Sequence, residues 1–274
     1  MQSIQDLITL DLTDLALATG AIGISIGISA WQSLGLEGRL ALAATRTIVQ
    51  MLVVGAVLQA VFEWRNPIAL VAIVGFMTTV ASFAANGRIA NRTRRLLPVV
   101  WLAIFSGGAA AVLYTNIIVL RSPGLWLNPQ YMIPLAGISI GNAMNSAAIA
   151  GERFASLLAA SQLEIETHLC LGATPEMAVA EYRRESIRAG MLSIINSMMV
   201  VGLVTLPGIV TGQILSGVDP LIAAAYQILI LFAIALASIV ASSILTAGMW
   251  RHYFNAAMQF SLPSSANQSV RNKK

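Results

Sequence analysis

Long apolar stretches without a charged residue constrain this chain more than any other feature of its sequence. A helix needs about 20 apolar residues to cross the roughly 30 Å hydrocarbon core of a bilayer. Six charge-free runs exceed that length, and a seventh is long enough if Arg46 lies at the interface and extends its side chain to water. The runs predict an all-α membrane protein with about seven transmembrane helices, lying within 15–36, 47–62, 66–87, 96–120, 122–151, 189–218 and 220–250.

The composition supports a surface that faces lipid. Only 10% of the residues are charged and 57% are hydrophobic, whereas soluble domains carry about 25% charged residues. The net charge of +4 could suggest nucleic-acid binding, but the arginines lie between apolar runs and do not form one patch. We therefore expect the lipid bilayer, and no nucleic acid, as a partner.

The basic residues between the runs predict the orientation, because Lys and Arg accumulate on the cytoplasmic side. With the N-terminus outside, fourteen of the sixteen fall inside, and only Arg65 and Arg121 lie outside. The first residues include Asp6, Asp11 and Asp14 but no Lys or Arg, whereas a cleavable signal peptide begins with basic residues. We therefore expect a multi-pass protein of the cell inner membrane, N-out and C-in, that retains its first run.

A polar loop at about 152–190, between the fifth and sixth runs, is the longest on the predicted inner side. Its first helix should end near Leu171, because Gly172 can adopt the left-handed conformation that ends helices. Thr174 is suited to cap a second helix, with Pro175 at its first position. The loop therefore predicts a cytoplasmic helix-turn-helix that leads into the sixth span.

The chain has no internal repeat and is predicted to form one membrane domain over 1–261. The polar, basic segment 262–274 is predicted to be a disordered tail. Without a repeat, the chain supplies only half of a two-fold assembly, and two-fold pairs are the commonest oligomers. We therefore expect a homodimer.

Several strings resemble a known transporter family. Glu166 precedes Gly172 by six residues in ETHLCLGATP, which is similar to the E-A-A-x-x-x-G element of ABC-transporter permeases, with Thr167 and His168 in place of the two alanines. Further strings follow in order along the chain: IGNAMNSAAIAGERF (140–154), LEIETHLCLGATP (163–175), INSMMVVGLVTLPGIVTGQILSG (195–217) and YQILILF (226–232). Together they look like the FetB-type permeases, a bacterial iron-export ABC family related to plant aluminium-sensitivity permeases.

The resemblance implies a membrane-spanning subunit that exports a metal ion, iron in that family, with ATP hydrolysed by a separate soluble subunit. The chain contains no G-x-x-x-x-G-K-[ST] phosphate-binding loop, so we expect no catalytic site and no cofactor of its own. The turn between the loop helices would dock into the ATPase through Glu166, Gly172, Ala173, Thr174 and Pro175. Alternatively, Gly172 only ends a helix and Glu166 is a solvated charge.

Polar and small residues in the fifth and sixth runs have two interpretations. They either pack helices together, because small residues allow close approach and amides hydrogen-bond in lipid, or they line a translocation path. Pro207-Gly208 would break the sixth helix in the second case. The candidate residues are Gly141, Asn142, Asn145, Asn196, Met198, Met199, Pro207, Gly208 and Gln213.

Two other classes of function remain as alternatives. A secondary transporter or channel is disfavoured because the interiors of the runs lack the ionisable residues that usually carry coupling charge. A membrane-embedded enzyme would need a metal cluster or a Ser-His or paired-Asp site at membrane depth, and no such pattern is present. Both histidines and Cys170 lie on the predicted inner side, so the sequence predicts no metal site in the membrane.

The orientation is tested by cysteine labelling of intact cells. We expect a cysteine at position 3 to react with an impermeant reagent and one at position 270 to be protected. The reverse labelling pattern would contradict the predicted orientation.

Overall fold

The computed structural model describes residues 12–64, 67–89, 94–121, 128–255 and 257–261. Regular structure in these ranges is helical, apart from two isolated bridges. The α-helices are α1 Leu12–Trp31, α2 Glu37–Trp64, α3 Pro67–Arg88, α4 Leu97–Tyr114, α5 Pro129–Ala160, α6 Gln162–Cys170, α7 Pro175–Ala178, α8 Ala180–Val200, α9 Gly208–Leu215 and α10 Pro220–Met249. Short 3-10 helices cover Arg94–Leu96 and Trp250–Tyr253, and a π-helix, Thr115–Leu120, extends α4.

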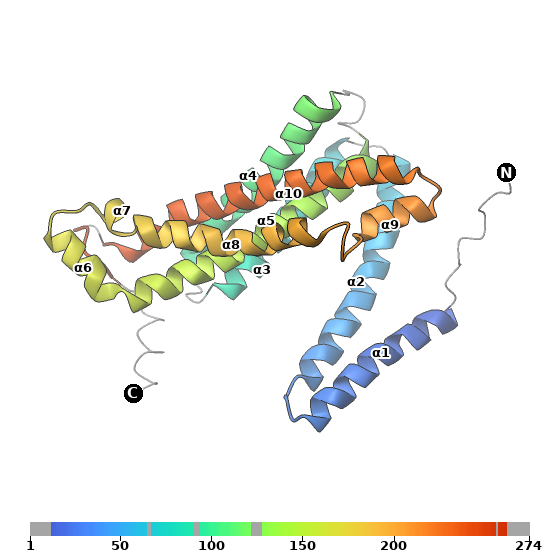
Figure 1. The fold of residues 1–274 in the computed structure, drawn as a ribbon, viewed down its shortest axis with the longest axis horizontal. Helices are drawn as coiled ribbons and strands as arrows, with labels where there is room; N and C mark the ends of the chain where they lie inside the picture. The colour runs from blue at the N-terminus through green and yellow to red at the C-terminus, as the bar shows by residue number, and fades with distance from the viewer. Residues whose placement is uncertain (1–11, 65–66, 90–93, 122–127, 256, 262–274) are drawn as a thin grey trace.

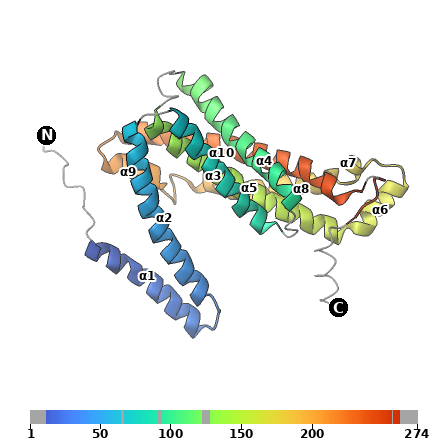
Figure 2. The ribbon, with the colours of Figure 1, turned by 180° about the vertical axis from the view of Figure 1, so that it is seen from behind.

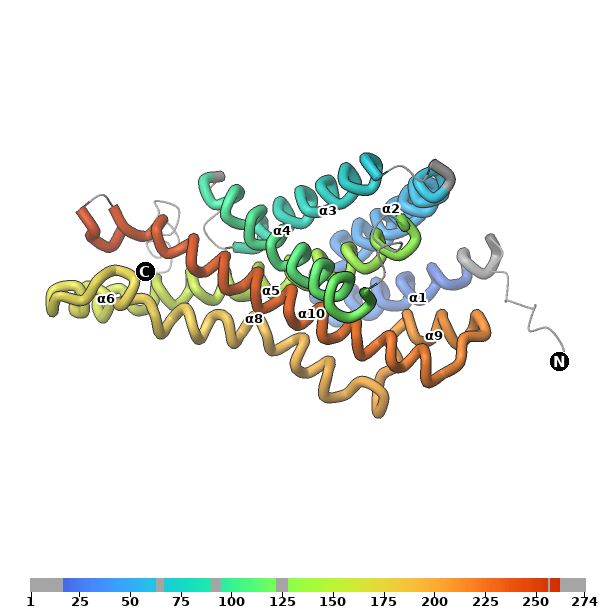
Figure 3. The backbone as a smooth tube through the Cα atoms, turned by 90° about the horizontal axis from the view of Figure 1, so that it is seen from above, coloured from blue at the N-terminus to red at the C-terminus, as the bar shows by residue number. Residues whose placement is uncertain are grey.

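Three long helices, α5, α8 and α10, run side by side and form the body of the molecule (Figure 1). Helices α3 and α4 pack on one side of α5 and α10, and α8 packs on the other (Figure 3). Helices α6 and α7 lie at one end of this bundle, whereas α1 and α2 form a hairpin that projects away from it (Figure 2). The elements of the predicted cytoplasmic loop therefore lie at one extremity.

The two central helices are longer than a membrane is thick. At about 1.5 Å per residue, the 32 residues of α5 and the 30 residues of α10 extend about 48 and about 45 Å. The hydrocarbon core is only about 30 Å thick. Each helix therefore continues beyond the bilayer and can connect its interior to the end that carries α6 and α7.

Helix α8 crosses α5 and α10 at one point of very close contact. A Cβ atom at Gly190 would lie 2.7 Å from the carbonyl oxygen of Ser146 and 3.1 Å from Ala150 Cβ and Ser242 Oγ. The helices approach closely because the residues at the crossing are small, which is typical of helix pairs in membranes. Gly190 therefore fixes the distance of α8 from both central helices.

Five described helices are long and apolar enough to span a membrane: Glu37–Phe62, Pro67–Arg88, Leu97–Leu120, Pro129–Ala160 and Pro220–Tyr253. They confirm an all-helical, multi-pass membrane protein, whereas seven spans and the orientation stay predictions. The predicted first span, 15–36, overlaps most of α1, in which Leu17–Trp31 is an apolar stretch. The predicted tail 262–274 and the acidic positions Asp6 and Asp11 lie outside the described residues.

The predicted second and sixth spans differ from the structure. The second is longer than 47–62, because α2 begins at Glu37 and includes Arg39 and Arg46. The sixth, 189–218, is not one helix: α8 ends at Val200 and α9 begins at Gly208. Gly202, with a φ of 82°, turns the intervening backbone, and Pro207 cannot donate the hydrogen bond that would continue a helix.

Large apolar side chains cover the outside of the projecting hairpin and of α3. Leu17 is 77% exposed, Leu42 72% and Ile68 76%. A water-soluble protein rarely shows so much contiguous apolar surface. This surface matches the lipid contact that the composition predicts.

Substitution of Gly190 tests whether the close crossing is essential. We expect Gly190→Ala to lower the free energy of unfolding by about 1–3 kcal/mol, because the new methyl group meets backbone that must move. Thermal unfolding of the purified protein measures the change.

Gly75→Ala on α3 is the matched control, because no atom lies within 4 Å of its Cβ position. It should leave stability unchanged or raise it, since alanine favours helix over glycine. Equal destabilisation by both substitutions would contradict the role of the crossing.

Candidate functional site

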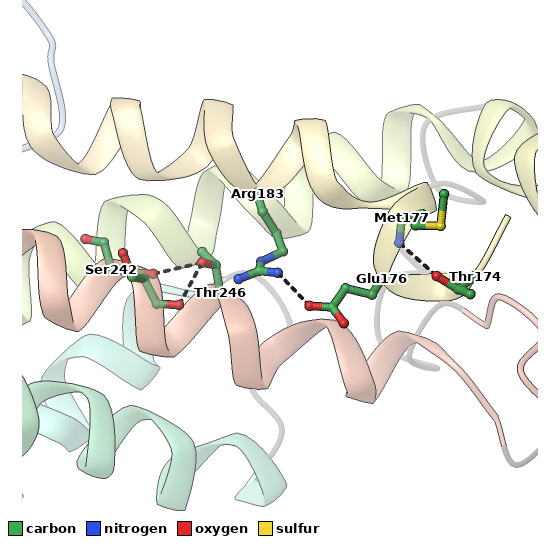
Figure 4. Close-up of polar contacts among 7 residues, drawn as sticks. Thr174, Glu176, Met177, Arg183, Ser242 and Thr246 are labelled. Carbon is green, nitrogen blue, oxygen red and sulfur yellow. Dashed lines mark hydrogen bonds and ion pairs between the residues drawn. The ribbon is translucent and has the colours of Figure 1, made fainter.

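The turn between α6 and α7 has the geometry that its sequence predicts. Helix α6 ends at Cys170, one residue before the expected Leu171, and Gly172 has a φ of 91°. The side chain of Thr174 accepts a hydrogen bond from the backbone N–H of Met177, 3.3 Å away, with Pro175 at the first helical position (Figure 4). The helix-turn-helix is therefore confirmed, and its turn is fixed by local backbone chemistry.

Helix α6 is held against the start of α8 by one strong polar contact. The hydroxyl of Tyr182 donates to Glu164 Oε2 at 2.7 Å, and the next residue of α6, Ile165, is fully buried. Burial, reinforced by the negative charge of Glu164, raises the pKa of Tyr182. The hydroxyl therefore stays protonated and can donate at neutral pH.

Two ion pairs connect the elements around the loop. Arg153 on α5 binds Glu185 on α8, with its Nε 3.1 Å from the carboxylate. Arg183 on α8 reaches back to Glu176 on α7 at 3.4 Å (Figure 4). Both pairs are partly exposed, so each contributes at most about 1 kcal/mol, but together they orient α7 and the base of α5 relative to α8.

The segment that follows α10 folds onto the same region. After α10, the chain turns so that Phe254 and Phe260 form an isolated antiparallel bridge. Phe260 stacks on Tyr253 at a ring-centroid distance of 6.3 Å, and Tyr253 packs edge-to-face on Phe154 of α5, also at 6.3 Å. We call residues 254–255 and 257–261 the C-terminal turn; Phe260 anchors it to α5 through Tyr253.

A hollow of about 660 Å³ opens between the loop and the C-terminal turn. Three of the five predicted coupling residues, Glu166, Ala173 and Pro175, line it. Of the other two, Thr174 is exposed, and no atom lies within 4 Å of a Cβ position at Gly172. The described residues that line it are Glu166, Leu169, Cys170, Ala173, Pro175, Ala257, Met258, Gln259 and Phe260.

The predicted polar residues of the fifth run lie on one partly uncovered stripe of α5. Asn145 is exposed, and its side-chain oxygen accepts a 2.9 Å hydrogen bond from Arg88 at the end of α3. Asn142 donates to the carbonyl of Ile138 at 2.9 Å. Gly141 faces open space. The two asparagines therefore do not bond to each other, and Asn145 contacts α3.

The predicted residues of the sixth run lie on both sides of the helix break. Asn196 and Met199 are exposed near the end of α8, and Met198 is partly buried. Pro207 and Gly208 begin α9. Gln213 lies further along α9, and its Oε1 is buried without a hydrogen-bond partner. The structure therefore places these residues along a discontinuous helix and not on one continuous face.

Sequence reasoning missed the contacts that hold the loop in place. Tyr182, Arg153 and the C-terminal turn carry no motif, and their partners are distant in the sequence. Only the concentration of aromatic residues at and after the end of the last run, Trp250, Tyr253, Phe254 and Phe260, could have indicated a packed element there.

The described residues contain no group of three or more His, Cys, Asp or Glu side chains that could hold a metal ion. His168 and Cys170 are exposed in the loop region. This end of the molecule combines a turn with a left-handed Gly172, a hollow beside it, and long helices that lead away from it.

Comparisons with known proteins place the chain in a family of membrane proteins. The model of the uncharacterised protein family UPF0014 matches residues 12–254. The UPF0014 membrane protein slr1647 of Synechocystis is 46% identical over 92% of this chain and 97% of its own length. The protein ALUMINUM SENSITIVE 3 of Arabidopsis thaliana is 30% identical, covering 89% of this chain and 88% of its own. The probable iron export permease protein FetB of Escherichia coli is 29% identical, over 89% of this chain and 93% of its own length. No solved structure matches the chain significantly.

Removal of the Tyr182 hydroxyl tests how α6 is held. Tyr182→Phe should cost about 1 kcal/mol of local stability, so that backbone amides of α6 exchange with solvent about fivefold faster. Hydrogen exchange followed by mass spectrometry measures this rate. Tyr114→Phe, at an exposed tyrosine on α4, is the control and should leave α6 unchanged. Unchanged exchange in the Tyr182 variant would show that the contact does not hold the helix.

Proposed function

Because the chain belongs to the UPF0014 family of membrane permeases, we propose that it is the membrane-spanning subunit of an ABC transporter. A separate soluble ATPase subunit supplies the energy, and the cargo is a metal ion. The observation that carries this proposal is the loop at the end of the bundle, where a rigid turn and a hollow lie beside each other at the ends of the long helices.

The ATPase is proposed to dock at the turn that contains Gly172. Residues at the turn project outward, and the 660 Å³ hollow beside it can receive a side chain from a partner. Glu166 at its edge offers a carboxylate to a basic or N–H donor of the ATPase, and its other local contact is the side-chain amide of Gln162 at 2.8 Å. Both features suit a protein surface better than a small ligand, because the hollow is wide and open.

Movement at the turn is proposed to travel through α5 and α8. Both helices leave the loop directly, the Arg153–Glu185 pair links them near its base, and Gly190 locks them together further along. A packed pair of helices moves as a unit more easily than it bends. A push from the ATPase therefore reaches the Asn145 stripe and the end of α8 at the same time.

The cargo is proposed to be iron, by relation to the Escherichia coli iron export permease. The stripe of Gly141, Asn142 and Asn145 on α5, with Asn196 and Met199 on α8, would contribute to the path. Because the amides carry no charge, they can hold a metal ion only weakly, which allows release after each cycle.

We propose a homodimer on the basis of the same stripe. Within one chain, Asn145 is exposed apart from its contact with Arg88, and no atom lies within 4 Å of the Cβ position of Gly141, although α5 is a candidate span. Polar groups that face hydrocarbon cost free energy, so a second copy that covers them is favourable. We propose that two permease chains enclose the path and bind two ATPase subunits.

A secondary transporter or channel is the second candidate, favoured by the discontinuous α8–α9 helix. Many secondary transporters bind substrate at such broken helices. These carriers usually place ionisable residues at membrane depth, whereas the buried polar residues described here are all uncharged Ser, Thr, Asn or Gln. Dependence of transport on a partner ATPase separates the two candidates.

Substitution at the turn tests the coupling role. Gly172→Val forces a β-branched residue to positive φ at a cost of about 1–2 kcal/mol, and its side chain projects toward the docking partner. We expect loss of co-purification with a co-expressed ABC ATPase, while native mass spectrometry still detects a permease dimer.

Gly217→Val is the matched control. Gly217 has a φ of 84° and no atom within 4 Å of its Cβ position. A valine there is strained by the same positive φ as at Gly172, but the site lies outside the loop. The Gly217→Val variant should still co-purify with the ATPase. If both variants bind the ATPase like the unmodified chain, the turn is not the coupling element.

A further inference from the structure

The C-terminal turn holds an exposed methionine in a strained backbone conformation. Met258 has a φ of 59°, and it is 59% exposed. Residues with a Cβ atom are disfavoured in this left-handed region, which glycine and, less often, asparagine adopt. Such strain persists only where the surrounding structure holds the residue, and strained residues cluster at functional sites. Met258 is therefore a candidate for a functional contact.

Hydrogen bonds between Asn255 and Gln259 fix the backbone around Met258. The Oδ1 of Asn255 accepts from the backbone N–H of Gln259, and its Nδ2 donates to Gln259 Oε1, both at 2.9 Å. The carbonyl of Asn255 accepts from the N–H of Met258, also at 2.9 Å. At the base of the turn, the N–H of Ser261 donates to the carbonyl of Tyr253 at 2.8 Å. These bonds keep Met258 in the left-handed conformation although its side chain is exposed.

One hollow borders both the C-terminal turn and the loop. Met258 and Phe260 line it together with Glu166 and Pro175. A protein that docks at the Gly172 turn and inserts a side chain into this hollow therefore also contacts the C-terminal turn.

Large apolar side chains are exposed on the loop side of the hollow as well. Leu171 follows the lining residue Cys170 and is 81% exposed, and Met177 on α7 is 67% exposed. An exposed group of apolar side chains beside polar residues marks an interaction surface. Methionine suits such a surface, because its flexible side chain adapts to a partner.

The charge of the hollow favours a protein partner over the membrane surface. Glu166 is the only charged residue among the described residues that line it. The cytoplasmic surface of a membrane is negatively charged and attracts basic segments of proteins. A carboxylate without a basic neighbour in the lining therefore favours a partner protein that presents a basic side chain among apolar ones.

We propose that the C-terminal turn is a second docking contact for the ATPase subunit, with Met258 as the residue that touches it. This inference rests on the proposed function and adds a contact outside the coupling loop. Helix α10 continues through the 3-10 helix Trp250–Tyr253 into the turn. An ATPase bound at both elements therefore holds α10 as well as α5 and α8.

Two substitutions of Met258 separate docking from backbone strain. Asparagine tolerates the left-handed conformation but removes the apolar side chain, whereas leucine keeps an apolar side chain and the strain. Titration of the full-length permease with a purified ABC ATPase, one that co-purifies with the unmodified chain, measures the affinity. We expect Met258→Asn to weaken binding on the order of tenfold. Met258→Leu should stay within about twofold of the unmodified chain, because it conserves apolar volume.

A turn that only stabilises the permease predicts a different result. Met258→Asn would then relieve strain and leave the affinity for the ATPase unchanged. That outcome, or equal losses from both substitutions, overturns the docking contact. Thermal unfolding of both variants is the control for folding, and Met258→Asn should unfold at no lower temperature than the unmodified chain.

The same titration with Gly172→Val distinguishes this contact from the proposed function. If Gly172→Val loses the ATPase and Met258→Asn binds normally, the C-terminal turn is not a docking contact and the coupling loop stands. If only Met258→Asn weakens binding, the turn is a docking contact and the coupling role of the loop fails. If the unmodified chain binds no ABC ATPase, the proposed function fails and the second contact fails with it.

Discussion

The close crossing of α8 with α5 and α10 at Gly190 is the contact on which the rest of the structure depends. The carbonyl of Ser146 occupies the space where any larger residue would place its side chain. Because hydrophobic burial does not drive helix association within lipid, close packing of small residues must supply much of the attraction. The crossing therefore sets how rigidly the loop at one end is connected to the polar residues within the membrane.

Around this crossing, a packed body of helices can be distinguished from a projecting hairpin whose side chains are mostly exposed. Helices α3, α4, α5, α8 and α10 form one packed body (Figure 3), whereas α1 and α2 project from it with most side chains exposed. The loop is fastened to the packed body by the Tyr182–Glu164 contact and by the aromatic side chains of the C-terminal turn. A force applied at the turn near Gly172 therefore acts on α5 and α8 and not on a flexible linker.

The sequence predicted those features that local chemistry decides. Charge-free runs indicated the long helices, and the Gly172, Thr174 and Pro175 pattern predicted the turn correctly because left-handed glycine and N-capping are properties of a few adjacent residues. The break of the sixth span was predicted only in part: Pro207-Gly208 marked where α9 begins, but the end of α8 at Val200 depends on backbone contacts around Gly202.

Features that depend on distant residues could not be read from the sequence. The pairing of Arg88 with Asn145, the hollow shared with the C-terminal turn, and the contact of Asn116 with Met132 all depend on helix register. Register in this bundle follows from where small residues allow contact, and a chain with many Ala, Gly and Ser residues offers several such choices. Only the folded structure shows which register the helices adopt.

Photocrosslinking from the chain's single cysteine tests coupling through the loop most directly. Cys170 is exposed and lines the hollow, so a benzophenone maleimide attached there should crosslink to a co-expressed ABC ATPase upon illumination. The same probe at Leu203→Cys in a Cys170→Ser background, at an exposed position in the α8–α9 break, should not. Equal crosslinking from both positions, or none from Cys170 in a complex that retains the ATPase, would contradict docking at this loop.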